Sequence, residues 1–367
     1  MGAGALAKAE VACLKSLKRV LPKWLPQRCL RCLGPMVGAS ELAFRLLTRT
    51  LGSADVTWTP MIDANGYAKS EAYRAETGRF DAADAPCVAQ IAGRDPVCVE
   101  RAAALLAPCE SVAAVELNVG CPQRCARNGG YGAFLLDEPD LLEDLVRALG
   151  RGCGTTRCLA AVKVRVYPES LQKTVDLCVR LARAGAQLLT VHGRGRLHRD
   201  ADPADWEVIR RVKLAVKSQC PGTLVIANGD AKTLRDLRRC ASYTNCDGVM
   251  AARAFLKDPA CFSPPPSVLA SSSPAEVRDT QALAVARTYL GHVADVGAPY
   301  QSIRRHLADI LERPLRRAPH LRKPLSALRG KTPSTAALDR LHHAIDDLQE
   351  TLSASSYNRT RRFSSTA

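Results

Sequence analysis

One cysteine stands where a predicted strand ends. Residues 113–117 form an apolar run that leads into Asn118, Gly120, Cys121 and Pro122, and a loop rich in small residues follows as far as residue 133. An apolar run that meets Gly and Pro is typical of a strand that reaches the edge of a sheet. A thiol fixed there by proline can be presented to a ligand above the sheet. The alternative is a buried thiol that serves as a small apolar side chain, which is the commoner use of a single cysteine.

Several other polar residues also fall at the ends of apolar runs. Lys163 lies in a run that should be buried, so its ammonium needs an anionic partner or a route to solvent. His192 ends another run, where it is either a structural histidine or a ligand contact. The pair Asn228 and Gly229 is typical of a turn, and it also suits a loop that binds phosphate. Together these positions predict one ring of polar groups around one ligand: Pro35, Met36, Gln90, Asn118, Lys163, His192, Asn228 and Arg253.

The elements that must position these residues alternate between short apolar runs and amphipathic helices. Eight strands are predicted, near residues 31–37, 55–62, 86–91, 112–118, 160–166, 186–192, 223–228 and 246–252. Helices are predicted between them, for example over residues 41–51, 96–106, 141–149, 171–184 and 206–216. Eight such repeats predict an α/β fold of the TIM (β/α)8 barrel type, whose active site lies at the carboxyl ends of the strands.

The composition limits the class of protein. The chain has 367 residues and a formal net charge of +16, which favours a polyanionic partner such as nucleic acid. Its 15 cysteines are scattered through a chain too large to need disulfides, so a reducing compartment is expected. The pair Cys29 and Cys32 forms a CxxC without a second pair at zinc spacing, so we predict no metal. No apolar run has the length of a membrane span.

The predicted organisation has five parts. A basic N-terminal extension occupies residues 1–30, the barrel residues 31–262, a Pro/Ser linker residues 263–274, a helical domain residues 275–352 and a disordered basic tail residues 353–367. The extension is either a mitochondrial presequence or a basic helix, and its lysines and scarce hydroxyl residues favour the second. Cytoplasm or nucleus is therefore the expected location, with mitochondria as the alternative. Residues 304–331 carry nine cations and two acids, which favours a surface that follows phosphates.

The stretch from Gly120 to Leu135 resembles a signature of the tRNA-dihydrouridine synthases, GCPQ-x-x-AR-x-G-x-YGAFL. Its form is similar to that of the eukaryotic subgroup that acts on positions 16 and 17 of the tRNA D-loop. Further matches to the family are Pro35–Met36–Val37, the strand with Gln90, the V-H-G-R of His192, and Asn228–Gly229 with the G-V-M element before Ala252 and Arg253. Arg253 departs from the carboxylate usual in the nearest subgroup, although bacterial relatives often have arginine there.

The resemblance implies a set of roles. Cys121 would give a proton to C5 of the uracil ring, while FMN, re-reduced by NADPH or NADH, gives the hydride to C6. Contacts to FMN would come from Pro35, Met36, Val37, Gln90, Lys163, His192, Asn228, Gly229, Asp230, Ala252 and Arg253. Asn118, Arg165 and Arg194 would contact the substrate, and the helical domain would bind tRNA. A general acid needs a thiol rather than a thiolate, so Cys121 should not be strongly acidified.

Two alternatives remain open from the sequence. The first is an FMN-dependent reductase of free pyrimidines, which would leave the large positive charge without a purpose. The second is a non-catalytic module that binds or folds tRNA. The presence of Cys121, Lys163 and His192 together argues against this second alternative.

Overall fold

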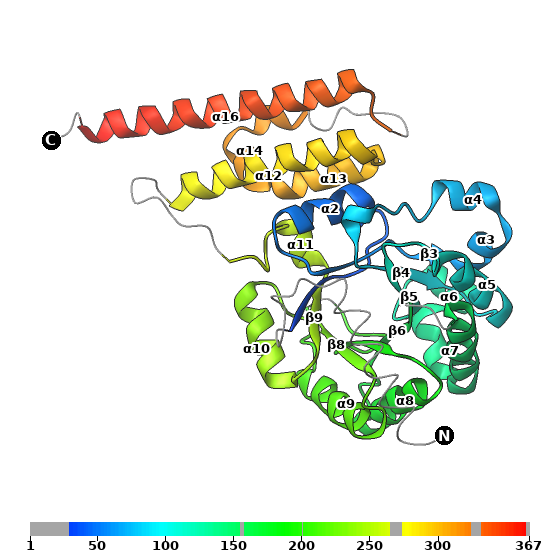
Figure 1. The fold of residues 1–367 in the computed structure, drawn as a ribbon. Helices are drawn as coiled ribbons and strands as arrows, with labels where there is room; N and C mark the ends of the chain where they lie inside the picture. Colours follow the sequence, from blue (N-terminus) through cyan, green and yellow to red (C-terminus); the bar gives the residue numbers. More distant parts are fainter. Residues whose placement is uncertain (1–28, 155–157, 200, 265–273, 324–331, 365–367) are drawn as a thin grey trace.

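The structure is a computed structural model that describes residues 29–154, 158–199, 201–264, 274–323 and 332–364 (Figure 1). Nearly all of the predicted N-terminal extension and most of the predicted linker lie outside these described residues. The described chain forms a barrel of strands enclosed by helices, and further helices lie against one side of it (Figure 1).

Eight parallel strands close into the barrel, as the sequence predicts. Each pairs with its neighbour in the order β2-β1-β9-β8-β7-β6-β5-β4, and β2 pairs with β4 to complete the ring. The two-residue strand β3, Ile62–Asp63, adds to the carboxyl end of β4. The barrel strands are β1 Leu30–Leu33, β2 Val56–Trp58, β4 Cys87–Ala92, β5 Val112–Val119, β6 Leu159–Arg165, β7 Leu188–His192, β8 Leu224–Asn228 and β9 Gly248–Ala251.

The helices between the strands cover the outside of the barrel (Figure 1). Apolar stripes at helical spacing bury one face of each long helix on the strands, and polar residues begin several of them: the Asp205 carboxylate caps α9 and Thr233 caps α10. None of the described helices combines the length and apolar character needed to cross a bilayer. They are α2 Leu42–Thr50, α3 Ala64–Lys69, α4 Glu71–Glu76, α5 Pro96–Leu106, α6 Arg124–Gly129, α7 Pro139–Cys153, α8 Leu171–Arg183, α9 Trp206–Gln219, α10 Leu234–Thr244 and α11 Arg253–Lys257.

Residues that alternate along the strands fill the inside of the barrel in layers. The lower layers are apolar and include Leu30, Val88, Leu159, Leu188 and Ile226. The upper positions of the same alternation are polar because the inward face continues from Ala114 to Glu116 and Asn118 in β5, and from Ala161 to Lys163 and Arg165 in β6. The barrel therefore has an apolar floor and a polar mouth at the carboxyl ends of its strands.

The C-terminal helices pack together beside the barrel. They are α12 Pro274–Val296, α13 Tyr300–Ile310, α14 Glu312–Arg317 and α16 Thr335–Ser364, with a short turn at Pro319–Leu321. Helix α12 lies between α2 of the barrel and α16 (Figure 1). Helix α16 continues through residues 353–364, for which the sequence predicted a disordered tail. Residues 335–364 contain no Pro or Gly, so nothing in that stretch interrupts a helix.

A buried polar cluster joins these helices to the barrel. The Glu41 carboxylate, at the start of α2, accepts hydrogen bonds from Tyr289 Oη at 2.8 Å and from His306 Nε2 at 3.1 Å. The His306 ring stacks on Phe44 with 4.0 Å between centroids. Since His306 Nδ1 is buried without a partner among the described residues, the ring proton belongs on Nε2. The charge of Glu41 is thereby satisfied inside this interface.

Candidate active site

Cys121 lies just past β5 at the barrel mouth. The Asn118 side-chain oxygen accepts the backbone N–H groups of Gly120 at 2.9 Å and Cys121 at 3.0 Å, and Cys121 O accepts the N–H of Ala133 at 3.0 Å. Gly132 has a φ of +65°, and a Cβ there would come within 2.6 Å of Cys121 O, so this turn requires glycine. Burial raises the pKa of the half-buried thiol, which therefore stays protonated at neutral pH.

Lys163 comes from the neighbouring strand, in register with Asn118. Its Nζ donates to Asn228 Oδ1 at 2.9 Å, and the Asn228 amide in turn donates to the backbone oxygen of Met250 at 2.9 Å. Burial lowers the pKa of Lys163 to about 8, against the attraction of Glu116. An ammonium in this position, with a neutral amide as its acceptor, is suited to an anionic ligand.

His192 ends β7, in register with Arg165 on one side and Asn228 on the other. Burial lowers its pKa to about 2, and the cations Lys163, Arg165, Arg194 and Arg253 add to this effect. The imidazole is therefore neutral at physiological pH. It can donate one hydrogen bond and accept another, but it cannot supply positive charge to a ligand.

The two predicted substrate arginines differ in their surroundings. Arg165 donates to the backbone oxygens of Gly120 at 2.7 Å and Gly195 at 2.9 Å, so it joins the cysteine loop to the loop after β7. Arg194 is buried and forms an ion pair with the Asp230 carboxylate, while its Nε donates to Asp202 O at 2.5 Å. These contacts position the loops, and substrate contacts by either arginine remain a prediction.

The loop after β8 is held from below and from the side. Gly229 has a φ of +123°, and a Cβ there would come within 2.5 Å of the Ala204 side chain, so glycine is required. Asp230 lies in the left-handed region at a φ of +60°, and its carboxylate accepts the N–H of Ala204 at 2.6 Å in addition to the Arg194 ion pair. The Asp230 side chain is thus occupied within the protein.

The remaining predicted contacts lie at the same mouth. Gly34 N donates to Ala251 O at 2.7 Å, so residues 35–37 begin at the end of β1 beside the end of β9. The turn is closed by Ser40, whose Oγ accepts Met36 N–H at 3.0 Å, while Val37 is 68% exposed. Ala252 precedes the short helix α11, in which Arg253 is the first residue.

Glu116 and its partner Thr190 lie at the site and were not predicted as site residues from the sequence. Glu116 is fully buried below Asn118, and its carboxylate accepts hydrogen bonds from Gln90 Nε2 at 2.8 Å and Thr190 Oγ1 at 3.0 Å. Burial raises the pKa of Glu116, and the nearby Lys163 opposes this shift. The period of two in a strand places Glu116 on the same face as Asn118, so this signal was available in the sequence.

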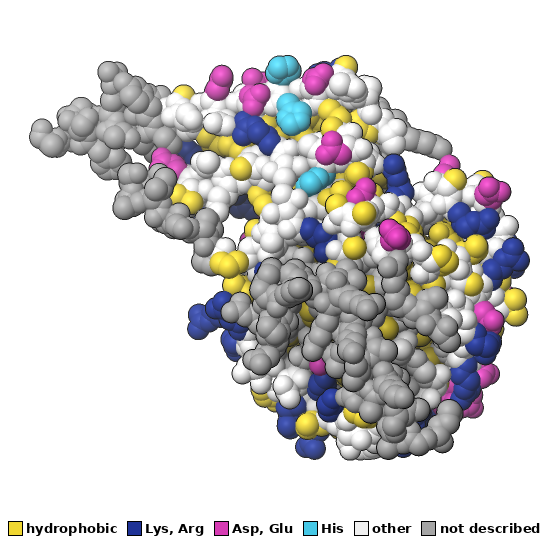
Figure 2. All heavy atoms as spheres, in the orientation of Figure 1, with side chains coloured by type: hydrophobic (Ala, Val, Ile, Leu, Met, Phe, Trp, Pro, Cys, Tyr) yellow, Lys and Arg dark blue, Asp and Glu magenta, His cyan; other side chains and the backbone are white. Residues whose placement is uncertain are grey.

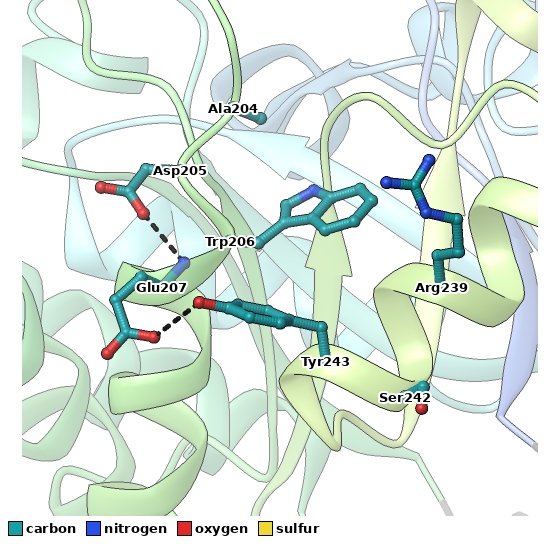
Figure 3. A pocket seen from close by; sticks show the side chains of 7 residues that line it. All are labelled: Ala204, Asp205, Trp206, Glu207, Arg239, Ser242 and Tyr243. Carbon is teal, nitrogen blue, oxygen red and sulfur yellow. Dashed lines mark hydrogen bonds between the residues drawn. The ribbon is translucent and has the colours of Figure 1, made fainter.

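An open pocket of about 750 Å³ lies between the start of α9 and α10 (Figure 3). Trp206 and Tyr243 line it together with Arg239, and the Tyr243 hydroxyl donates to Glu207 Oε2 at 3.0 Å. The Trp206 indole N–H donates to Gly229 O at 3.0 Å, so the wall of this cavity also supports the loop after β8.

Part of the basic segment of the helical domain, residues 304–331, is occupied by ion pairs within the protein. Arg313 and Arg317 of this segment both form ion pairs with Asp279 of α12, at 3.1 and 2.6 Å. Arg316 is 71% exposed and pairs with Glu312, and Arg322 is also exposed. Two of the nine cations therefore join helices, while Arg329 and Lys331 lie outside the described residues. Cations also gather elsewhere on the face shown in Figure 2.

The described residues contain no group of three or more His, Cys, Asp or Glu side chains that could hold a metal ion. The mouth instead gathers a protonated thiol, a half-buried ammonium, a neutral imidazole and the three amides of Gln90, Asn118 and Asn228 above an apolar floor. A closed parallel barrel with these groups at the carboxyl ends of its strands defines a TIM-barrel protein with a candidate ligand site at that mouth.

Comparison with known proteins identifies the family. A family model described as "Dihydrouridine synthase (Dus)" matches residues 32–349, and the chain belongs to this family. A rat protein named as a tRNA-dihydrouridine(16/17) synthase, NAD(P)(+)-like, is 36% identical over 300 residues, which are 80% of this chain and 63% of that protein. A fission-yeast tRNA-dihydrouridine(20a/20b) synthase is 39% identical over 229 residues, 62% of this chain and 67% of its own length.

The chain spans about six-tenths of the length of the first of these relatives. Among solved structures, morphinone reductase matches with a TM-score of 0.41 at 12% identity, over 63% of this chain and 84% of that one. That likeness is too distant to inform the chemistry of the site.

Proposed function

We propose that this protein reduces uridine to 5,6-dihydrouridine in the D-loop of tRNA, at position 16 or 17, with FMN as cofactor and NADPH as the source of electrons. One observation carries the proposal: the Cys121 thiol, in the loop just past β5, and the Lys163 ammonium, on the neighbouring strand β6 in register with Asn118, lie at the same barrel mouth. Membership of the dihydrouridine synthase family supports the same reaction. The rat relative supports the choice of positions 16 and 17 through its name.

The residues at the mouth fit a flavin mononucleotide. Lys163 is a half-buried cation whose lowered pKa would recover beside the anionic edge of a reduced flavin ring. Asn228 and Gln90 provide amide groups, and neutral His192 can make hydrogen bonds without adding charge. The backbone of the loop with Gly229 and the start of α11 at Arg253 would hold the phosphate, since amides and one cation suit an anion.

When bound, reduced FMN supplies the hydride that is added at C6 of the uracil. Cys121 supplies the proton at C5, and a raised pKa keeps that proton on the thiol until it is needed. Proton transfer leaves a thiolate, and the same cations, Arg165 and Lys163, favour that charged form. Cys121 would thus supply the proton at C5, and Lys163 would stabilise the thiolate that remains and the reduced flavin that gives the hydride.

To reach the mouth, the target uridine would have to unstack from its neighbours in the tRNA, as the target bases of other base-modifying enzymes do. Exposed cations of the helical domain, such as Arg316 and Arg322, would bind phosphates of the same molecule. The large formal charge of +16 supports a polyanionic substrate over a free pyrimidine. We place the reaction in the cytoplasm or nucleus, in keeping with the lysine-rich N-terminal stretch.

The decisive experiment compares the wild type with Cys121→Ala on tRNA lacking dihydrouridine, with nucleosides quantified by mass spectrometry. We expect Cys121→Ala to form dihydrouridine at least ~100-fold more slowly, the typical loss of a general acid. Its bound flavin and its oxidation of NADPH should match the wild type. Equal turnover by the variant would remove Cys121 from the mechanism. Wild-type turnover of free uracil but not tRNA would favour a pyrimidine reductase, and no turnover of either would favour a non-catalytic tRNA-binding module.

A further inference from the structure

A buried carboxylate lies below the cysteine loop and belongs to none of the roles assigned above. Glu116 is fully buried in β5, two residues before Asn118 on the same inward face. Its two oxygens accept one hydrogen bond each, from the Gln90 amide at 2.8 Å and from the Thr190 hydroxyl at 3.0 Å. Burying a carboxylate there is unfavourable unless its hydrogen bonds offset the loss of water.

A chain of hydrogen bonds leads from this carboxylate to the cysteine. Gln90 Oε1 accepts from Asn118 Nδ2 at 2.9 Å, and Asn118 Oδ1 accepts the backbone N–H groups of Gly120 and Cys121. Two side chains, Gln90 on β4 and Asn118 on the adjacent strand β5, therefore connect Glu116 to the backbone of Cys121.

The polarity of the carboxylate fixes the direction of every bond in this chain. Both Glu116 oxygens act as acceptors, so Gln90 turns its NH2 group toward Glu116 and its oxygen toward Asn118. Asn118 must then donate to Gln90, which leaves Asn118 Oδ1 for the backbone N–H of Cys121. If Gln90 were reversed, Asn118 would reverse as well, and its NH2 group would face two N–H donors. That arrangement would release the cysteine loop.

We infer that Glu116 is a positioning residue for the proposed reduction: by fixing the amide orientations of Gln90 and Asn118, it holds the backbone of Cys121 at the barrel mouth. This inference rests on the proposed function for its catalytic meaning. Lys163, in the neighbouring strand, favours the ionised form of Glu116, so the cation at the site also maintains the direction of the chain.

The test measures the Cys121 thiol directly, in the ligand-free full-length protein and without turnover. Alkylation by iodoacetamide is followed by site-resolved mass spectrometry. Glu116→Leu removes the acceptor at similar volume, so the loop should open more often and Cys121 should react at least ~3-fold faster. Cys220, a half-buried thiol at the end of α9 and the opposite end of the barrel, serves as internal reference and should be unchanged.

Two further variants separate orientation from general loosening. In Glu116→Gln, the new amide oxygen can still accept a hydrogen bond from Gln90, and the new NH2 group can donate to the Thr190 hydroxyl. This variant should therefore react with iodoacetamide at a rate within ~2-fold of wild type. Thr190→Val removes the other donor to Glu116 without interrupting the chain, and should also leave Cys121 unchanged. If Glu116→Leu does not fold, Gln90→Leu breaks the next link and should give the same acceleration.

An unchanged Cys121 rate in a folded Glu116→Leu or Gln90→Leu variant would overturn the inference, and so would an equal acceleration in Thr190→Val. Steady-state kinetics provide the catalytic readout, where Glu116→Leu should lower kcat for dihydrouridine formation and leave KM for tRNA unchanged. A wild-type protein that reduces no uridine would refute the proposed function, while the alkylation result would still decide whether Glu116 holds the cysteine loop.

Discussion

Replacing Lys163 with methionine should make the ligand-free protein more stable and its flavin binding weaker. Burial lowers the pKa of Lys163 from 10.5 to about 8. Each pKa unit is worth ~1.4 kcal/mol, so keeping this lysine protonated at pH 7 costs the fold ~3 kcal/mol. Methionine has a similar shape and no charge, although its introduction leaves Glu116 without the cation. We therefore expect a net gain of ~1–2 kcal/mol in the free energy of unfolding.

The difference in stability between Lys163→Met and the wild type should depend on pH. The folded pKa lies below the unfolded one, so the cost is fully present below pH 8. As the pH rises from about 8 to 10.5, the unfolded chain holds the proton that the folded chain has lost, and the wild type gains stability. The stability advantage of Lys163→Met should therefore shrink over that range.

The assay is urea unfolding of both ligand-free proteins at pH 7 and pH 9.5, with Lys69→Met as the control for loss of an exposed ammonium. Flavin binding is measured by titration with FMN at pH 7, where Lys163→Met should bind at least ~10-fold more weakly, equivalent to ~1.4 kcal/mol. A variant that is less stable than wild type at pH 7 and binds FMN equally well would refute the assignment of Lys163 as an ammonium held ready for an anion.

Three further predictions concern other parts of the molecule. Arg316→Glu with Arg322→Glu should weaken tRNA binding and reduce the slope of log affinity against log salt by ~2, in filter-binding measurements at several salt concentrations; an unchanged slope would exclude both from phosphate contacts. Tyr289→Phe should lower the free energy of unfolding by ~1.5–3 kcal/mol because its hydroxyl bonds a buried carboxylate, whereas Tyr243→Phe, at an exposed bond, should cost under ~1 kcal/mol. Below pH 6.5 the unfolded His192 takes up a proton while the folded one stays neutral, so the wild type should lose ~1.4 kcal/mol of unfolding free energy per pH unit at this residue. His192→Gln should lack this loss, and an unfolding free energy that falls equally with pH in both proteins would contradict the lowered pKa of His192.

The barrel could be predicted from the sequence because each strand buries one apolar run and ends at a recognisable breaker. The run before Asn118 and the run with Lys163 lie in β5 and β6, and helix α5 has the predicted bounds, Pro96–Leu106. Strand and helix signals depend on neighbouring residues only, so one sequence is sufficient to find them. The predicted site residues lie around one mouth for the same reason, since all were placed at strand ends.

Contacts between distant segments could not be predicted in this way. Asp279 neutralises Arg313 and Arg317 from another helix, 34 and 38 residues away, and a count of charges within residues 304–331 does not include it. The partners of Glu116 lie 26 and 74 residues away, in strands whose register depends on closure of the barrel. Alternation along β5 indicates that Glu116 points inward, but only the register shows that Gln90 and Thr190 meet it.

The helical domain contributes to the barrel mouth through the loop after β1. Ser302 of α13 donates to Gly38 O at 3.1 Å, and Gly38 follows directly on the predicted flavin contacts at residues 35–37. Three residues further on, the Glu41 carboxylate accepts hydrogen bonds from Tyr289 and His306 of the same domain. Both ends of residues 38–41 are thus bonded to the helices proposed to bind tRNA. Any shift of those helices on binding RNA must therefore move this loop or break a buried charged hydrogen bond. The loop with the predicted flavin contacts and the helices proposed to bind tRNA are consequently joined by three hydrogen bonds.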